Sequence, residues 1–452
     1  MKKRIFLILI LVLNLIWISG CGADSGAPTD LTTEPATTES SATEPATTEP
    51  LMTEPPVSAI NHVNLGVDDQ YTIADGETLL SYYEEPVESF FGVCKYYEEL
   101  GWTLYGSHTL NNNQFATYTK ENELVHIYWI ACERELNIAT SSTGGDALPS
   151  AYPHFISKSE NTSITQLQSS EVNGMGYVIK LSDGSFLVID GGYASNAKEL
   201  WSALVELNGG EENILIRAWL LTHSHKDHYE CFSSFSSRYA SRVTLDTLMI
   251  SPLSSNDSSN LYLSNKVNKD IAKFRVADIL YVHTGMVFNF GNITLEILFT
   301  PDEFLISEPV QDEDYIENLN FNCSSIISRI YTNDCRVIFL ADCTEETALR
   351  LLLYYGEYLR SEMCQVSHHG VDDCPLIVYR FINASTYWYP CNLKLFDSEE
   401  RHADIRKAII ASKSTQEIIR HDQGRITRSL EAIDDDSLSC ACPPPMPTEE
   451  AS

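Results

Sequence analysis

The sequence predicts an α/β domain over residues 160–430, preceded by a small α+β domain over residues 59–150. Three observations predict this organisation. One helix-like segment followed by two strand-like runs fills the first region. In the second region, apolar runs typical of buried strands alternate with amphipathic helices. Three of those apolar runs end in clusters of histidine and aspartate, which places the chemistry of the chain in the second domain.

Length and charge limit the function classes. The chain has 452 residues and 43% hydrophobic content, enough apolar material for sizeable cores. Lys and Arg total 30 and Asp and Glu total 63, so the formal net charge is −33. So acidic a surface repels nucleic acid in general, although a bound metal can still create a local cationic site. With 12 cysteines in 452 residues, the chain does not belong to the class of small disulfide-rich scaffolds.

The N-terminus resembles a bacterial lipoprotein signal. Three basic residues, 2–4, precede an apolar run over residues 5–18, and Ser19-Gly20-Cys21 resembles a lipobox. The resemblance implies that residues 1–20 are a signal peptide, that Cys21 carries lipid, and that the protein is anchored to the extracytoplasmic face of the cell membrane. An uncleaved signal anchor is the alternative.

Two segments are expected to be disordered. Residues 21–58 are rich in Thr, Glu and Pro and repeat TEPATTE twice, which predicts an extended stalk. Residues 433–452 contain a run of three aspartates at 434–436 and three consecutive prolines, which predicts a disordered tail. Both segments have little apolar surface to bury.

The first element that the sequence predicts in the small domain is a helix. Apolar residues from Val87 to Leu100 follow helical spacing, and Gly101 is a plausible stop. Residues 115–118 and 124–130 read as strands around a polar turn. His108 and His126 lie here without metal-like spacing, so we expect structural roles for both.

The α/β domain opens with a hairpin. Residues 177–181 and 186–189 are the predicted strands, and Asp190-Gly191-Gly192 ends the second one. A helix is expected to begin near Asn196, with Glu199 completing a capping box.

The strongest signal follows the next predicted strand, residues 214–221. It is an H-x-H-x-D-H pattern. Alternate side chains of an extended loop point the same way, so His223 and His225 can share one divalent ion. Asp227 and His228 can turn to a second ion. The alternative is a polar surface loop in which histidines cluster without binding metal.

Two further strand ends carry matching side chains. Residues 336–340 form an apolar strand that leads to Asp342, where a carboxylate can bridge two ions. Residues 362–366 form another, which ends in His368-His369-Gly370. One histidine of that pair can complete the coordination of the second ion.

Together these motifs resemble the metallo-β-lactamase superfamily over roughly residues 164–428. The His-His-Gly ending is similar to that of ComEC-type competence-protein hydrolase domains and surface phosphorylcholine esterases, as is the Asn/Ser-rich stretch 318–325. The resemblance implies an αββα metallo-β-lactamase sandwich with two metal ions at one edge, usually Zn²⁺, with Mn²⁺ as the alternative.

The resemblance also implies a role for each motif residue. His223 and His225 would hold the first ion, Asp342 would bridge, and the second ion would be held by Asp227, His228 and His369. Asp190 would orient the ligand loop from behind.

The sequence leaves the roles of two histidines open. His368 is a candidate proton donor or substrate contact, and a purely supporting hydrogen bond is equally compatible with its position. Many relatives carry one more histidine before the bridging aspartate. His283 is the only one in that interval, and we expect it to be packed or solvent-facing rather than a ligand.

The implied function is a metal-dependent surface hydrolase, in which activated hydroxide attacks a phosphoester or similar ester and Asp227 orients the nucleophile. The acidity of the chain favours small or cell-surface phosphoesters over long nucleic acid. The alternatives are an extracellular nuclease of the ComEC type and a non-catalytic surface lipoprotein that binds a cell-wall component. Neither a Gly-rich phosphate loop nor a serine nucleophile elbow is evident in the sequence.

Overall fold

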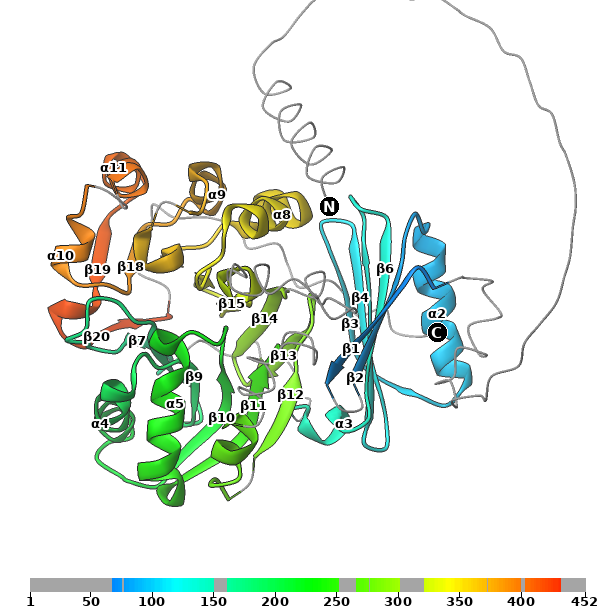
Figure 1. The fold of residues 1–452 in the computed structure, drawn as a ribbon, viewed down its shortest axis with the longest axis horizontal. Helices are drawn as coiled ribbons and strands as arrows, with labels where there is room; N and C mark the ends of the chain where they lie inside the picture. The colour runs from blue at the N-terminus through cyan, green and yellow to red at the C-terminus, as the bar shows by residue number, and fades with distance from the viewer. Residues whose placement is uncertain are drawn as a thin grey trace, which may run out of the picture. The chain divides into compact units, whose positions relative to one another are not determined.

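The computed structural model shows a small α+β domain followed by an α/β domain (Figure 1). It describes residues 67–74, 77–149, 161–251, 266–275, 277–300, 321–371, 373–399 and 403–431. The predicted signal peptide with Cys21, the stalk and the tail lie outside these ranges. Within them, none of the helices has the length and apolar character needed to span a bilayer.

The small domain is one antiparallel sheet with a long helix packed on it and a short helix, α3 (Gly144–Ala147), after its last strand. Its six strands have the order β1-β2-β6-β5-β4-β3. Helix α2 (Val87–Glu99) buries Phe90 and Val93 and packs against β4 and β5. Gly101 follows the helix with φ +79°, as predicted for a helix stop. The strands are β1 (Asp69–Ala74), β2 (Glu77–Tyr82), β3 (Thr103–Leu110), β4 (Asn113–Lys120), β5 (Glu123–Ile130) and β6 (Glu135–Ser141).

The α/β domain contains two seven-stranded mixed sheets. The first has the order β12-β11-β10-β9-β8-β7-β20, in which β9 to β12 are parallel. Its strands are β7 (Ser163–Gln166), β8 (Gly176–Lys180), β9 (Phe186–Asp190), β10 (Ile214–Leu220), β11 (Val243–Ile250), β12 (Asp278–Tyr281) and β20 (Ile426–Ser429).

The second sheet has the order β13-β14-β15-β16-β17-β18-β19, and its strands β16 to β19 are parallel. They are β13 (Val287–Phe290), β14 (Ile293–Phe299), β15 (Ile327–Tyr331), β16 (Arg336–Phe339), β17 (Met363–Gln365), β18 (Thr386–Tyr389) and β19 (Glu417–Arg420). Each sheet combines one parallel region with one antiparallel region, and parallel strands are typically buried on both faces.

Three apolar cores show that the layers run helix, sheet, sheet, helix. One core lies between the sheets and draws Tyr177 and Leu220 from the first and Phe339 and Trp388 from the second. A second core packs the first sheet against helices, and a third packs the other sheet against helices. The helices are α4 (Ala197–Leu207) and α5 (Lys226–Tyr239) on the first sheet, and α8 (Glu345–Tyr355), α9 (Leu376–Ile382) and α11 (Ala403–Ala411) on the second (Figure 1). The predicted αββα sandwich is therefore confirmed.

The small domain shares a core with the second sheet. Phe115 and Tyr128 belong to the same apolar cluster as Phe299 and Leu340. The backbone carbonyl of Tyr354 also accepts hydrogen bonds from two asparagine side chains of the small domain, each 2.8 Å long. The two parts are therefore packed together rather than merely joined by the chain.

Gly285 marks a close approach between the two domains, and its substitution by alanine should destabilise the protein by about 3 kcal/mol or more. Gly285 has φ +89°, and a Cβ there would lie 1.8 Å from Cδ1 of Phe115. The matched control is Gly209→Ala, which has a similar φ of +72° but no atom within 4 Å of the added Cβ. Urea unfolding should give a markedly larger loss for Gly285→Ala, and equal losses would contradict this packing.

One predicted local feature is wrong. Helix α4 begins after Asn196, but no side-chain cap hydrogen bond forms there. The Asn196 side chain instead accepts from the backbone N–H of Tyr193, 3.1 Å away. The Glu199 carboxylate accepts from Arg425 at 2.8 and 3.0 Å, so a distant cation has displaced the predicted capping box.

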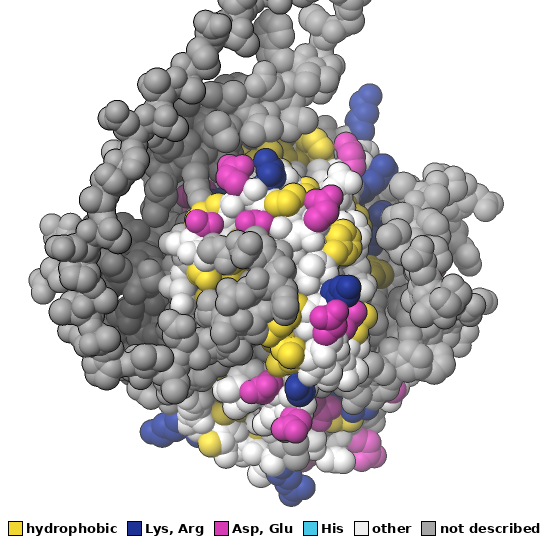
Figure 2. Space-filling view, turned by 90° about the vertical axis from the view of Figure 1, so that its right-hand side faces the viewer, with side chains coloured by type: hydrophobic (Ala, Val, Ile, Leu, Met, Phe, Trp, Pro, Cys, Tyr) yellow, Lys and Arg dark blue, Asp and Glu magenta, His cyan; other side chains and the backbone are white. Residues whose placement is uncertain are grey.

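The face shown in Figure 2 carries acidic, basic and hydrophobic side chains side by side. Helix α2 itself pairs Lys95 with Glu99 at 3.7 Å and exposes 55% of Phe91. Among the described side chains in this view, the charge of the protein is therefore not gathered into a single acidic patch.

Candidate metal centre

The predicted ligands come from strand ends of both sheets. The loop after β10 carries His223 and His225. The backbone of His225 is extended, and α5 begins at the next residue, Lys226. Asp227 and His228 therefore lie in the first turn of helix α5. Asp342 follows β16 and His369 follows β17 in the second sheet, so the site spans the edge where the two sheets meet.

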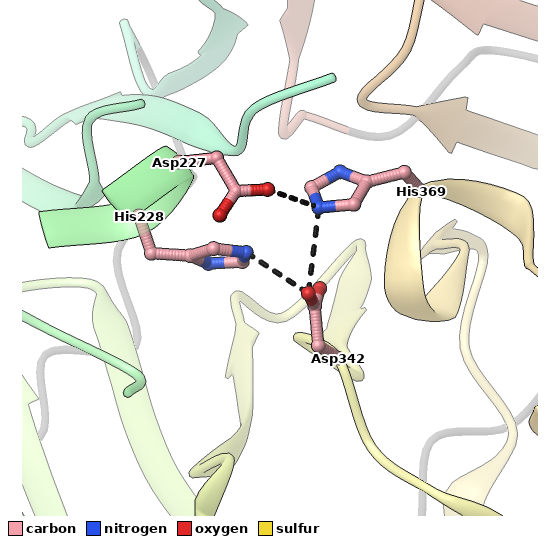
Figure 3. A group of neighbouring side chains, drawn as sticks. All are labelled: Asp227, His228, Asp342 and His369. Carbon is pink, nitrogen blue, oxygen red and sulfur yellow. Dashed lines mark ion pairs between the residues drawn. The ribbon is translucent and has the colours of Figure 1, made fainter. Parts of the chain in front are cut away.

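One group of four side chains converges at this edge. Asp227, His228, Asp342 and His369 each offer one ligand atom, and these atoms lie within 4.8 Å of one another (Figure 3). Nε2 of His228 is 3.2 Å from Oδ2 of Asp342. Nε2 of His369 is 2.9 Å from Oδ2 of Asp227 and 3.4 Å from Oδ2 of Asp342. This is a candidate site for one ion.

A second group shares one member with the first. His223, His225 and Asp342 also offer ligand atoms within 4.8 Å of one another. Nε2 of His223 lies 3.1 Å from Nδ1 of His225 and 3.8 Å from Oδ2 of Asp342. Asp342 therefore stands where one carboxylate can bridge two ions.

The donor atoms fit a cation. Nε2 of His228, Nε2 of His369 and Oδ1 of Asp342 are buried and have no hydrogen-bond partner. The first of these nitrogens is close to a carboxylate oxygen without a hydrogen bond, so its N–H direction misses that oxygen. Buried polar atoms without partners are costly. Imidazole nitrogen and carboxylate oxygen are suitable ligands for Zn²⁺ and related dications, so the residues present fit the implied metal.

Hydrogen bonds from behind fix the histidine rings. Nδ1 of His228 donates to Oδ2 of Asp190 at 2.7 Å, and the backbone N–H of Thr222 donates to Oδ1 at 2.8 Å. Nδ1 of His369 donates to the carbonyl of Pro390 at 3.0 Å. With Nδ1 occupied, Nε2 of each ring is the nitrogen that faces the site.

The backbone around the site adopts an unusual conformation at four positions. Asp190, Ala341, His368 and His369 have φ values of 53°, 49°, 47° and 58°. Residues with a side chain rarely adopt this left-handed region, because the conformation costs free energy. Such strain is retained where the surrounding structure holds it, and here it aims three strand ends at one point.

The α/β domain has the metallo-β-lactamase fold. Its two mixed sheets lie between helix layers, and the H-x-H-x-D-H motif follows β10 at their common edge. No protein-family model matches the sequence, and no curated protein matches it.

Several solved structures are similar to the chain at low sequence identity. The metallo-β-lactamase fold protein YhfI from Bacillus subtilis is 13% identical over 59% of this chain and 99% of its own, with a TM-score of 0.37. CmlA, a diiron β-hydroxylase from Streptomyces venezuelae, is 14% identical over 59% of this chain and 54% of its own, with a TM-score of 0.39. Zn²⁺-bound PqqB from Methylobacterium extorquens is 11% identical over 45% of this chain and 71% of its own, with a TM-score of 0.29.

The two groups differ in their protonation. Burial lowers the pKa of His228, but the carboxylates of Asp342 and Asp190 raise it well above the ordinary value. Burial likewise opposes protonation of His369, yet Asp342 and Asp227 raise its pKa to about 9. Burial and neighbouring histidines lower the pKa of His223. In the metal-free protein at pH 7, the first two rings are therefore protonated and His223 is neutral.

Zn²⁺ binding at pH 7 should release about two protons, one each from His228 and His369, because a metal binds only neutral imidazole. The sign follows from the raised pKa values, since the proton competes with the ion until pH rises to about 9 for His369. Titration calorimetry in buffers of different ionisation enthalpy measures the number released. His369→Ala lacks the His369 proton and weakens the ion that displaces the proton of His228, so it should release fewer protons than the wild-type protein. Unchanged release would contradict this protonation scheme.

His368 lies beside the two groups and belongs to neither of them. Its Nδ1 donates to Oδ2 of Asp373 at 2.6 Å, and its Nε2 lies 3.1 Å from Nδ2 of Asn322. Nε2 is also 3.9 Å from Oδ2 of Asp342, and 24% of the side chain is exposed. A partly exposed imidazole held by a carboxylate is suitably placed to exchange a proton beside the two groups.

His283 lies outside both groups. It is 3% exposed and stacks on His126, with ring centroids 6.3 Å apart. Nε2 of His126 in turn bonds the carbonyl of Thr284 at 2.9 Å. Both histidines are packed where the small domain meets the α/β domain, which agrees with the structural roles expected for them.

Sequence reasoning missed several supporting side chains. The Thr222 hydroxyl donates to Oδ2 of Asp190 at 2.7 Å, and the Gln365 amide bonds both backbone groups of Ala341 at 2.7 and 3.1 Å. Nδ2 of Asn173 donates to Oδ2 of Asp227 at 2.5 Å. Single polar residues at these positions carry no spacing pattern, so only the fold shows what they contact.

Proposed function

We propose that this protein is a metal-dependent hydrolase of the metallo-β-lactamase superfamily that binds two divalent ions, with Zn²⁺ favoured over Mn²⁺. One observation carries the proposal. Two groups of ligand atoms share the Asp342 carboxylate. Three of the buried ligand atoms have no hydrogen-bond partner: Nε2 of His228, Nε2 of His369 and Oδ1 of Asp342. The metal ligands would be His223, His225 and Asp342 in one group, and Asp227, His228, Asp342 and His369 in the other.

When bound, two dications supply Lewis acidity and lower the pKa of water. The side chains of the protein provide the rest. Asp190 would hold the His228 ring through a 2.7 Å hydrogen bond and thereby keep Nε2 directed to the site. Asp227 presents a carboxylate that can orient an attacking water. His368, supported by Asp373, would contact the substrate and, when protonated at Nε2, would give a proton to its departing oxygen.

A phosphoester is the substrate class that we propose, because the His368-His369-Gly370 ending resembles that of phosphoester hydrolases. The formal charge of −33 disfavours long nucleic acid, since phosphate capture along a strand needs basic surface. We therefore favour small or cell-surface phosphoesters over the extracellular nuclease activity of ComEC-type proteins. We also propose that lipid on Cys21 anchors the protein at the extracytoplasmic face of the membrane.

Metal analysis together with a chromogenic phosphodiester tests the proposed function. Wild-type protein should carry about two ions per chain and hydrolyse the phosphodiester, and removal of the ions by a chelator should abolish turnover. His228→Ala should lose one ion and most of the activity. A metal-free, inert wild-type protein would instead support a surface lipoprotein that binds a cell-wall component.

A further inference from the structure

A short segment between β7 and β8 contacts the metal centre, although no motif in the sequence pointed to it. Within this segment, the half-buried side chain of Asn173 lies between Asp227 and Tyr193. Its Nδ2 donates to Oδ2 of Asp227 at 2.5 Å, and its Oδ1 accepts from the Tyr193 hydroxyl at 3.2 Å. The amide therefore links the carboxylate of a proposed ligand to the residue that follows the Asp-Gly-Gly turn.

Chemistry fixes which end of the amide faces the carboxylate. An ionised carboxylate oxygen only accepts hydrogen bonds, so the NH₂ end of Asn173 must face Asp227. The phenol of Tyr193 is neutral at pH 7 and donates to the carbonyl end. Reversing the amide would place two acceptors against each other at Asp227. Both neighbours therefore favour the same orientation of the amide.

The backbone of this segment is tied to the site as well. Asn173 forms an antiparallel bridge with Cys391, and the N–H of Gly174 donates to the carbonyl of Pro390 at 3.1 Å. That same carbonyl accepts from Nδ1 of His369. The N–H of Met175 also donates to the backbone carbonyl of Asp227 at 3.0 Å. The segment is thus held against two proposed ligands of the same ion. These backbone hydrogen bonds fix the position from which the Asn173 side chain extends.

We propose that Asn173 is a positioning residue that holds the Asp227 carboxylate against His369 and so sets the affinity of the ion bound by Asp227, His228 and His369. Oδ2 of Asp227 receives the amide hydrogen bond and lies 2.9 Å from Nε2 of His369. Without the amide, the carboxylate can rotate away from that geometry. Partners of this kind behind metal ligands typically contribute 10–100-fold to metal affinity. This inference rests on the proposed two-ion function.

Two backgrounds separate the ions in the test. In His225→Ala, the remaining Zn²⁺ is bound by the group that contains Asp227, and adding Asn173→Ala should weaken it by about 10–100-fold. In His369→Ala, the ion that remains at His223 and His225 should keep its affinity when Asn173→Ala is added. Competition with a chromogenic zinc chelator measures both affinities without any assay of activity. Val172→Ala is the control, because its side chain is exposed in the same segment.

Each outcome has a defined meaning. Wild-type protein that binds no ion overturns the proposed function. Wild-type protein that binds two ions, combined with an unchanged affinity in the Asn173→Ala variant, overturns only this inference. Equal weakening in both backgrounds also overturns it, because a general structural defect would act on both ions.

Two milder variants guard against a misfolded protein. Asn173→Leu keeps the shape of the side chain without its polar atoms, and it should reproduce the loss of affinity seen for alanine. Tyr193→Phe removes only the support of the amide, so it should weaken the same ion by roughly two- to tenfold. Thermal unfolding of each metal-free variant confirms the fold. Unchanged affinity in both folded variants overturns the inference.

Discussion

Replacing Asp342 by asparagine should empty both metal groups and lower phosphodiester hydrolysis by at least about 10³-fold. The physical reason is that one carboxylate serves both groups. Oδ2 of Asp342 lies 3.2 Å from Nε2 of His228, 3.4 Å from Nε2 of His369 and 3.8 Å from Nε2 of His223. Asparagine keeps the shape but loses the negative charge that neutralises two dications. Ions per chain and the hydrolysis rate are measured together.

Asp278→Asn is the matched control, because Asp278 is exposed at the start of β12. It should keep about two ions and wild-type turnover. If Asp342→Asn keeps both ions, the bridging assignment is wrong. If it loses the ions but keeps its activity, the proposed metal-dependent hydrolysis is wrong. Circular dichroism of both variants separates loss of metal from loss of fold.

Glu77→Gln should stabilise the protein at pH 8 by up to about 3 kcal/mol while leaving its stability at pH 4 nearly unchanged. Glu77 is 1% exposed, and Oε1 accepts from the Ser141 hydroxyl whereas Oε2 has no partner. Burial raises its pKa from 4.5 to about 7, although the Ser141 hydrogen bond and His283 act in the opposite direction. Glutamine is neutral at every pH and avoids burying a charge.

The sign follows from proton linkage. Between pH 4.5 and about 7, the folded protein binds a proton at Glu77 that the unfolded chain has released. The wild-type protein therefore loses stability at this site as pH rises through that window, and the variant does not. Urea unfolding of both proteins at pH 4, 6 and 8 gives the difference in their free energies of unfolding. The contributions of other titrating groups are the same in both proteins and cancel in this difference. Glu123→Gln, an exposed carboxylate on β5, is the control. A difference that stays constant with pH would contradict the raised pKa.

Local pattern was enough to predict most elements of the fold. The helix Val87–Glu99 and the strands that end near Asp190, Leu220 and Phe339 lie within a few residues of their predicted positions. Apolar periodicity encodes the type, length and buried face of an element, because side chains repeat every 3.6 residues in a helix and every two in a strand. Part of the site was predictable for the same reason. The motif from His223 to His228 is short, and it directly follows a buried strand.

The partners of individual side chains were decided by the tertiary structure. Glu199 pairs with Arg425 instead of capping its own helix, and His283 stacks on a histidine of the small domain. Asn173 reaches Asp227 only because the segment before β8 pairs with the chain after β18.

The amino-acid order therefore specified which strands form, which residues end them, and which of those residues have metal-ligand chemistry. The packing of two sheets and a third, smaller sheet decided which of them meet. A side chain's partner often lies on an element that is distant in the chain. The spacing of apolar residues within one helix or strand carries no information about which distant element will pack against it.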